Sequence, residues 1–264
     1  MTKLSPARAW AARKQREKQQ AAAKAAVESA DPGAVTELTT TAEGFEALCM
    51  AMSQDVLWLH GKTLTEKQEF KVERLPGYME HVQEYMASGD VYANPVIVET
   101  MIWLADLLQD GHPASNAVEF EKIALLCVSQ GQKMPERFKS SLPTFVADAV
   151  HAWASHQIKL NHSPQPLFGN IFNQLHNWPV PRGVIMKYHK LAGQLATDAG
   201  EWKTAYILLT KADMLGTPKH PAKVTTIKKE VVKNLEKLGI QLPAVSLETE
   251  QPAPDAPDTD DDTE

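Results

Sequence analysis

The chain has 264 residues, of which 43% are hydrophobic and 23% are charged, enough for one or two domains with a hydrophobic core. Its net charge is −6, and no apolar run reaches the ~18 residues that a membrane span needs. Two cysteines, Cys49 and Cys127, make no disulfide framework, so we expect buried free thiols on apolar helix faces and a reducing cytoplasm.

Charge is unevenly distributed along the chain. Residues 1–28 hold seven Lys and Arg against two Glu, a local charge of +5, whereas residues 245–264 hold eight acids and no base. A basic beginning and an acidic end are typical of interaction arms.

The first segment is predicted to be a protruding basic helix. Ser5 and Pro6 form a helix start, since Ser is a favoured N-cap and Pro a favoured first helical residue. Strong helix formers continue to residue 29 with almost no apolar stripe. The Asp-Pro-Gly turn at 31–33 ends this helix, and a linker follows to residue 41.

Three shorter helices are expected next. An apolar stripe predicts a helix over residues 45–59, ended by Gly61. A charged helix over 65–74 is expected to close at the Leu-Pro-Gly sequence 75–77, before a short aromatic helix over 78–86.

The stretch 94–155 has the longest sustained helical periodicity. Two apolar stripes flank a turn at Gly111 and Pro113, which predicts an antiparallel helical hairpin. A third helix is expected over 144–157. The stripes are Ile97, Met101, Leu104 and Leu108, and Ala117, Phe120, Ala124 and Cys127.

A similar pattern returns in the C-terminal half. A Pro-rich region, 161–182, is expected to hold one short helix, and two apolar stripes around Ala199-Gly200 then resemble a tetratricopeptide hairpin. A last helix over 222–238, with an apolar stripe ending at Leu238, precedes a C-capping Gly239. We expect the acidic, Pro-rich sequence after it to be disordered.

These elements predict an all-α fold of stacked helical hairpins, tetratricopeptide-like in the C-terminal half, with a protruding basic N-terminal helix. We expect four parts. They are a basic helix and linker (1–41), a central helical domain (42–160), a C-terminal hairpin region (161–242) and an acidic tail (243–264).

No constellation of catalytic residues can be assigned from the sequence. The Gly-Lys-Thr at 61–63 matches the end of a phosphate-binding loop, but Val56 stands where that motif requires glycine, so a helix end is the better interpretation. His151 and His156 are five residues apart and do not share a helix face. We therefore predict no catalytic residue, no metal ligand and no cofactor.

The basic head is the best functional signal, because clustered cations can neutralise DNA phosphates without reading sequence. A solvated helix without a specific partner is the alternative. The predicted DNA-binding residues are Arg8, Arg13, Lys14, Arg16, Lys18 and Lys24.

The last helix and the tail leave several possibilities open. The stripe of the last helix could cap the second hairpin or pair with a neighbouring subunit, and its lysines could touch DNA. The acidic tail could dock on a basic partner, screen the basic head, or only aid solubility.

The segment 101–138, with its flanking features in order, resembles the small terminase subunits of peduovirus-type tailed phages. The matching residues are Trp103, Asp110, Gly111, Ala117, Ala124, Leu125, Gly131, Met134, Pro135 and the Phe-Val-Ala-Asp sequence 145–148. In this sequence the tail is acidic, whereas some relatives end in basic sequence, which weakens any tail-based DNA contact.

The resemblance implies a ring-forming homo-oligomer in the host cytoplasm, absent from the mature virion. It would bind the cos-type packaging site of double-stranded phage DNA and present it to the large terminase subunit. The resemblance also implies that the large subunit supplies cleavage and ATP-driven packaging, so this chain alone is not expected to be an enzyme. Two alternatives are a tetratricopeptide-like adaptor for a protein partner and a helical metal-dependent hydrolase.

Overall fold

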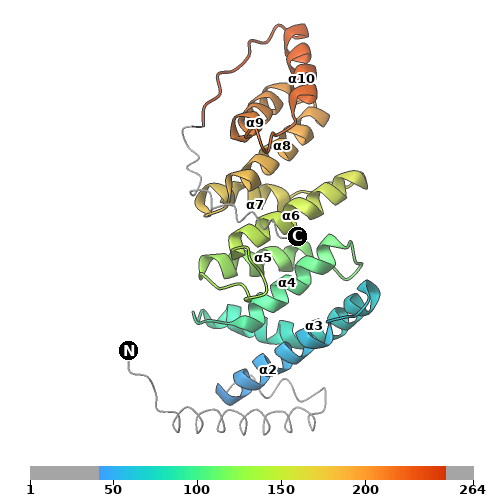
Figure 1. The fold of residues 1–264 in the computed structure, drawn as a ribbon, viewed down its shortest axis with the longest axis vertical. Helices are drawn as coiled ribbons and strands as arrows, with labels where there is room; N and C mark the ends of the chain where they lie inside the picture. The colour runs from blue at the N-terminus through green and yellow to red at the C-terminus, as the bar shows by residue number, and fades with distance from the viewer. Residues whose placement is uncertain (1–41, 248–264) are drawn as a thin grey trace, which may run out of the picture. The chain divides into compact units, whose positions relative to one another are not determined.

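The computed structural model describes residues 42–247, and this part of the chain is helical without any strand, which confirms the all-α fold (Figure 1). None of its helices is long and apolar enough to cross a membrane. The helices are α2 Ala42–Trp58, α3 Leu64–Ser88, α4 Pro95–Gln109, α5 Ala117–Ser129, α6 Leu142–Lys159, α7 Leu167–Gln174, α8 Arg182–Asp198, α9 Trp202–Leu215 and α10 Thr225–Lys237, with a 3-10 turn at Leu175–Asn177.

The chain divides into two compact units, residues 1–103 and 104–264, so the border falls within α4. The first unit has an aromatic core: the ring of Tyr78 in α3 packs edge-on against Trp103 in α4, with ring centroids 5.7 Å apart. Both side chains are buried, and Val82 lies fully buried one helical turn further along α3. The domain limits expected at residues 41, 160 and 242 remain predictions.

The expected break at residues 75–77 was wrong, because α3 runs through Pro76 without interruption. Pro76 lies on the exposed side of the helix, while Leu75, Tyr78 and Val82 form one buried stripe on the other side. A proline removes one helical hydrogen bond, but burial of a continuous apolar stripe offsets that loss, and the two expected helices are one.

In the second unit, α8 and α9 form a closely packed helical hairpin, and the sequence predicted a hairpin at this place. Gly193 of α8 makes the close approach possible, because a Cβ atom there would lie 2.7 Å from Leu209 Cγ of α9. The fully buried Tyr188 fixes α8 to its neighbours: its hydroxyl donates to the Ala147 carbonyl over 2.8 Å, and its ring stacks on Phe168.

The last helix, α10, packs against α9 and completes this core (Figure 1). Val231 and Leu235 of α10 are fully buried against Leu209 and Ala212. Leu238 is 59% exposed, so its expected place in the apolar stripe was wrong.

Leu238 is not part of the buried stripe because α10 ends at Lys237 and the chain turns there. Gly239 adopts a left-handed φ of +66°, which ends the helix, and Ile240 packs against the core instead.

Candidate functional site

The six cations predicted to bind DNA, Arg8, Arg13, Lys14, Arg16, Lys18 and Lys24, lie outside the described residues. We call them the basic arm. Their role remains a prediction from the sequence, and any site built from the structure must come from residues 42–247.

Within the body of the chain, charge changes sign at Arg182. Residues 42–181, which we call the acidic region, hold nine Lys and Arg against sixteen Asp and Glu. Residues 182–240, which contain α8, α9 and α10 and which we call the basic hairpin, hold eleven Lys and Arg against five Asp and Glu. The acidic region is therefore −7 and the basic hairpin +6, a contrast that the net charge of the chain conceals.

Two cations at the start of the basic hairpin have structural partners. Arg182 donates from Nε to the Leu215 carbonyl over 2.9 Å and from Nη2 to the Met214 carbonyl over 2.7 Å. It thereby satisfies carbonyls that the C-terminus of α9 leaves open. Lys187 forms a 3.1 Å ion pair with Asp148 of α6.

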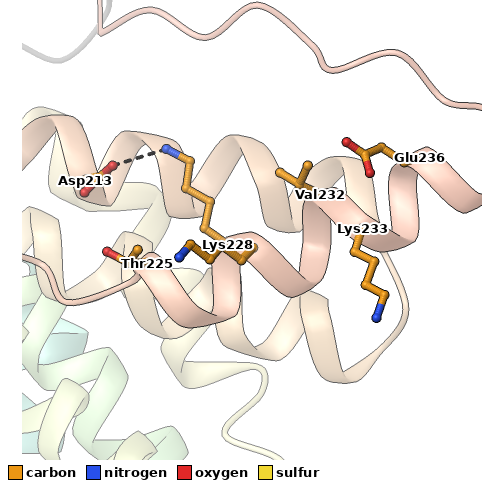
Figure 2. Close-up of a pocket in the computed structure, with 7 residues that line it drawn as sticks. Asp213, Thr225, Lys228, Val232, Lys233 and Glu236 are labelled. Carbon is orange, nitrogen blue, oxygen red and sulfur yellow. Dashed lines mark hydrogen bonds and ion pairs between the residues drawn. The ribbon is translucent and has the colours of Figure 1, made fainter.

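Three lysines of α10 line a groove of about 390 Å³ between α9 and α10 (Figure 2). Lys228 extends toward α9, where Nζ lies 3.2 Å from Asp213 Oδ2 and 5.9 Å from the centre of the Tyr206 ring. Its neighbours Lys229 and Lys233 are exposed and form no ion pair within residues 42–247. The groove is lined by Asp213, Thr225, Lys228, Lys229, Val232, Lys233 and Glu236.

This groove can bind carboxylates or phosphates. Its three lysines outnumber its two acids, one of the lysines already holds a carboxylate, and Val232 adds a small apolar surface. Lys ammonium groups are mobile point charges, so the groove favours anionic chains over one rigid ligand. From the sequence, DNA contact by the lysines was one of three possibilities left open for the last helix. A charge count over residues 182–240 would have revealed the contrast with the acidic region.

The Gly-Lys-Thr sequence is a turn and a helix cap, as the sequence favoured. Gly61 has a left-handed φ of +74°, and Thr63 is the N-cap of α3. The Glu66 N–H donates to Thr63 Oγ1 over 3.3 Å, and the Thr63 N–H donates to Glu66 Oε2 over 2.8 Å, a reciprocal capping box. The Thr63 hydroxyl also donates to Glu66 Oε2 over 2.7 Å, and this bond, together with the one from the Thr63 N–H, lowers the pKa of Glu66 below its ordinary value.

A buried carboxylate, Asp55 of α2, faces α3. Tyr78 donates its hydroxyl hydrogen to Asp55 Oδ2 over 2.7 Å, and Arg74 Nε lies 3.3 Å from the same oxygen. Burial raises the pKa of Asp55, although Tyr78 and Arg74 partly counteract this by stabilising the charged form. Burial and Asp55 together raise the pKa of Tyr78. The cluster links α2 to α3, because both partners of the Asp55 carboxylate belong to α3.

The thiols are poor nucleophiles in this environment. Cys127 is buried as expected, whereas Cys49 is only half-buried. Burial raises the pKa of Cys127 to about 12, and burial with the nearby Glu46 raises that of Cys49 to about 11. Both thiols are protonated near neutral pH. Within residues 42–247, no three His, Cys, Asp or Glu side chains come together as a metal site.

Comparison with known proteins identifies the family. Residues 50–182 match the model of the phage small terminase subunit family, which is half of the chain. A probable terminase endonuclease subunit of Haemophilus phage HP1 is 29% identical over 169 residues. That alignment covers 63% of this chain and 58% of the relative, so the chain matches somewhat more than half of the relative's length. No solved structure matches. The chain belongs to the phage small terminase subunit family, as its central segment predicted.

Proposed function

We propose that this protein is the DNA-recognition component of a phage packaging machine. It binds the cos-type packaging site of phage DNA, forms a homo-oligomeric ring and presents the DNA to the large terminase subunit. The family match over residues 50–182 is the observation that carries this proposal, because it places the chain among small terminase subunits.

The basic arm supplies the contact with DNA in this proposal. Six cations within residues 8–24 can neutralise phosphates and release counterions, which gives affinity that depends on salt but little on sequence. Each arm alone is a weak binder. A ring joins several arms, so that binding by one arm raises the effective concentration of DNA for the others.

Cleavage and ATP hydrolysis belong to the large subunit in this proposal. The relative's printed name includes an endonuclease subunit, and we infer that this describes the assembled terminase. We place the protein in the host cytoplasm during packaging and expect it to be absent from purified virions.

A gel shift with full-length protein tests the arm. The test variant replaces all six arm cations with Gln, and a matched control replaces Lys122, Lys133, Arg137, Lys139, Lys159 and Lys67 of the acidic region with Gln. We expect the arm variant to lose most of its affinity for a duplex from the phage packaging region and the control variant to retain it. Equal affinity in the arm variant and the unmodified protein would overturn the arm as the main contact.

Two further measurements test the assembly. Native mass spectrometry should find a closed oligomer, whereas a monomer at all concentrations would contradict the ring. Untagged large subunit should copurify with tagged full-length protein. This binding should depend on neither DNA nor the basic arm, because the proposal assigns it to contacts between the two proteins.

A further inference from the structure

The basic hairpin is followed in the chain by a segment of opposite charge. Residues 182–240 carry +6, and residues 248–264 carry eight acids without a Lys or Arg. The lysine groove lies on α9 and α10, the last two helices before that segment. A basic segment and an acidic segment with charges of similar magnitude are therefore close together in the sequence.

We propose that the α9–α10 groove is a docking site for the chain's own acidic segment, residues 248–264. The segment lies along the exposed side of α10 with its carboxylates on Lys229 and Lys233. This contact is separate from the DNA contact of the basic arm, and it holds whether or not that arm binds DNA.

The groove has the chemistry that such a segment needs. Lys228 already holds the Asp213 carboxylate at 3.2 Å, which shows the kind of contact that a tail carboxylate would repeat. Lys229 and Lys233 are exposed beside it, and Figure 2 shows Lys233 pointing away from Glu236. Val232 offers apolar surface to the Pro and Ala residues interspersed among the acids of the segment.

The chain is long enough to make this contact. The thirteen residues of α10 span about 20 Å, while the seventeen residues 248–264 can span roughly 56 Å when extended. The left-handed Gly239 and the packing of Ile240 turn the chain at the end of α10, and Figure 1 shows it leaving the direction of the helix there. The acidic segment is therefore long enough to run the whole length of α10.

Attachment favours the chain's own segment over other anions. A short tether gives an effective concentration on the order of mM, whereas a separate acidic peptide must bind from solution. Several exposed charge pairs must act together, since one such pair is weak. The contact should consequently weaken with salt, because the screening length falls from ~10 Å at 0.1 M to ~3 Å at 1 M.

Zero-length carbodiimide cross-linking of the full-length protein tests this proposal directly. Lys237 is the last basic residue, so trypsin releases all eight tail acids in one peptide, residues 238–264. We expect this peptide to link to Lys229 and Lys233 several-fold more often than to the exposed Lys139 and Lys159, after correction for amine reactivity. We also expect high salt to remove the preference. Equal linking to all four lysines, or none to the groove, would overturn the proposal.

A charge variant checks the result without relying on the substituted lysines. In the Lys229→Gln/Lys233→Gln variant, tail links to the neighbouring Lys223 and Lys228 should fall several-fold. In the Lys139→Gln/Lys159→Gln control they should be unchanged. Unchanged links in the groove variant would contradict docking on α10.

Isotope mixing distinguishes the chain's own tail from that of a neighbour. When labelled and unlabelled proteins are mixed and reassembled, own-chain docking predicts linked pairs of a single label. If the tail docks on a neighbour instead, random mixing of equal amounts makes about half of the linked pairs hybrid, and a hybrid share of that size would overturn the proposal. An unrelated acidic peptide or duplex DNA that fills the groove while the tail stays unlinked would likewise contradict the proposal.

Discussion

The acidic region and the basic hairpin are built alike and charged oppositely. Both are helical, and both close around fully buried side chains such as Val82 in the first and Leu209 in the second. The acidic region carries −7 and the basic hairpin +6. Helices with similar buried cores therefore carry surfaces of opposite charge, which attract ligands of opposite sign.

The family match falls almost entirely on the acidic region. It covers residues 50–182 and ends at the first residue of α8. The most basic part of the described chain, residues 182–240, lies almost entirely beyond this family match. The family assignment therefore rests on residues 50–182, whereas the effect of positive charge has to be tested in residues 182–240.

The largest effect is expected from the core of the basic hairpin. Leu209→Ala removes a fully buried side chain at the contact of α8, α9 and α10 and should lower the free energy of unfolding by ~2–5 kcal/mol. Met214→Ala is the control, because Met214 is in the same helix but 42% exposed. Urea unfolding measures both. Equal losses would contradict tight packing of Leu209 in the core of the basic hairpin.

A smaller effect is expected from the buried carboxylate of the acidic region. Tyr78→Phe removes the hydroxyl that donates to Asp55 and should cost ~1–3 kcal/mol, because the carboxylate loses a buried partner. Tyr206→Phe in the basic hairpin is the matched control, since that ring mainly packs near Lys228. If both changes cost the same in chemical denaturation, the Asp55 contact contributes little.

The helix cap at Thr63 should contribute less again. Thr63→Ala removes the N-cap of α3 and should cost ~0.5–2 kcal/mol, whereas Thr63→Ser should restore most of it. Thermal unfolding checks the stability, and a nucleotide-binding assay on the same variants checks the motif. A loss of ATP binding in Thr63→Ala would contradict the assignment of Gly-Lys-Thr to a turn and cap.

The pH dependence of the acidic region should be the smallest effect. Because burial raises the pKa of Asp55, the native state keeps this proton to higher pH than the unfolded state. The contribution of this group to stability therefore falls as pH rises above its ordinary pKa of 3.8, and it levels off above the raised pKa. Asp55→Asn should remove that fall in urea titrations. A contribution that instead increases with pH would show that the charged form is favoured.

Apolar periodicity predicted most helices of both regions, because buried stripes repeat at helical spacing. It failed at Pro76, where burial of Leu75 and Tyr78 outweighs the local break, and at Leu238, which follows the point where α10 ends. The groove was harder to predict. Lys229, Lys233 and Asp213 come from two helices, and one-dimensional spacing does not show which side of α10 faces Asp213.

The central claim is that the basic arm, outside the matched region, grips DNA. The most direct test is the slope of log affinity against log salt for duplex DNA, measured on the full-length protein. Neutralising the six arm cations should reduce its magnitude by as much as ~5 per arm engaged, since each phosphate contact contributes ~0.9. The Lys229→Gln/Lys233→Gln variant should keep the original slope. An unchanged slope in the arm variant, with a reduced one in the groove variant, would contradict the account and move the DNA contact to the basic hairpin.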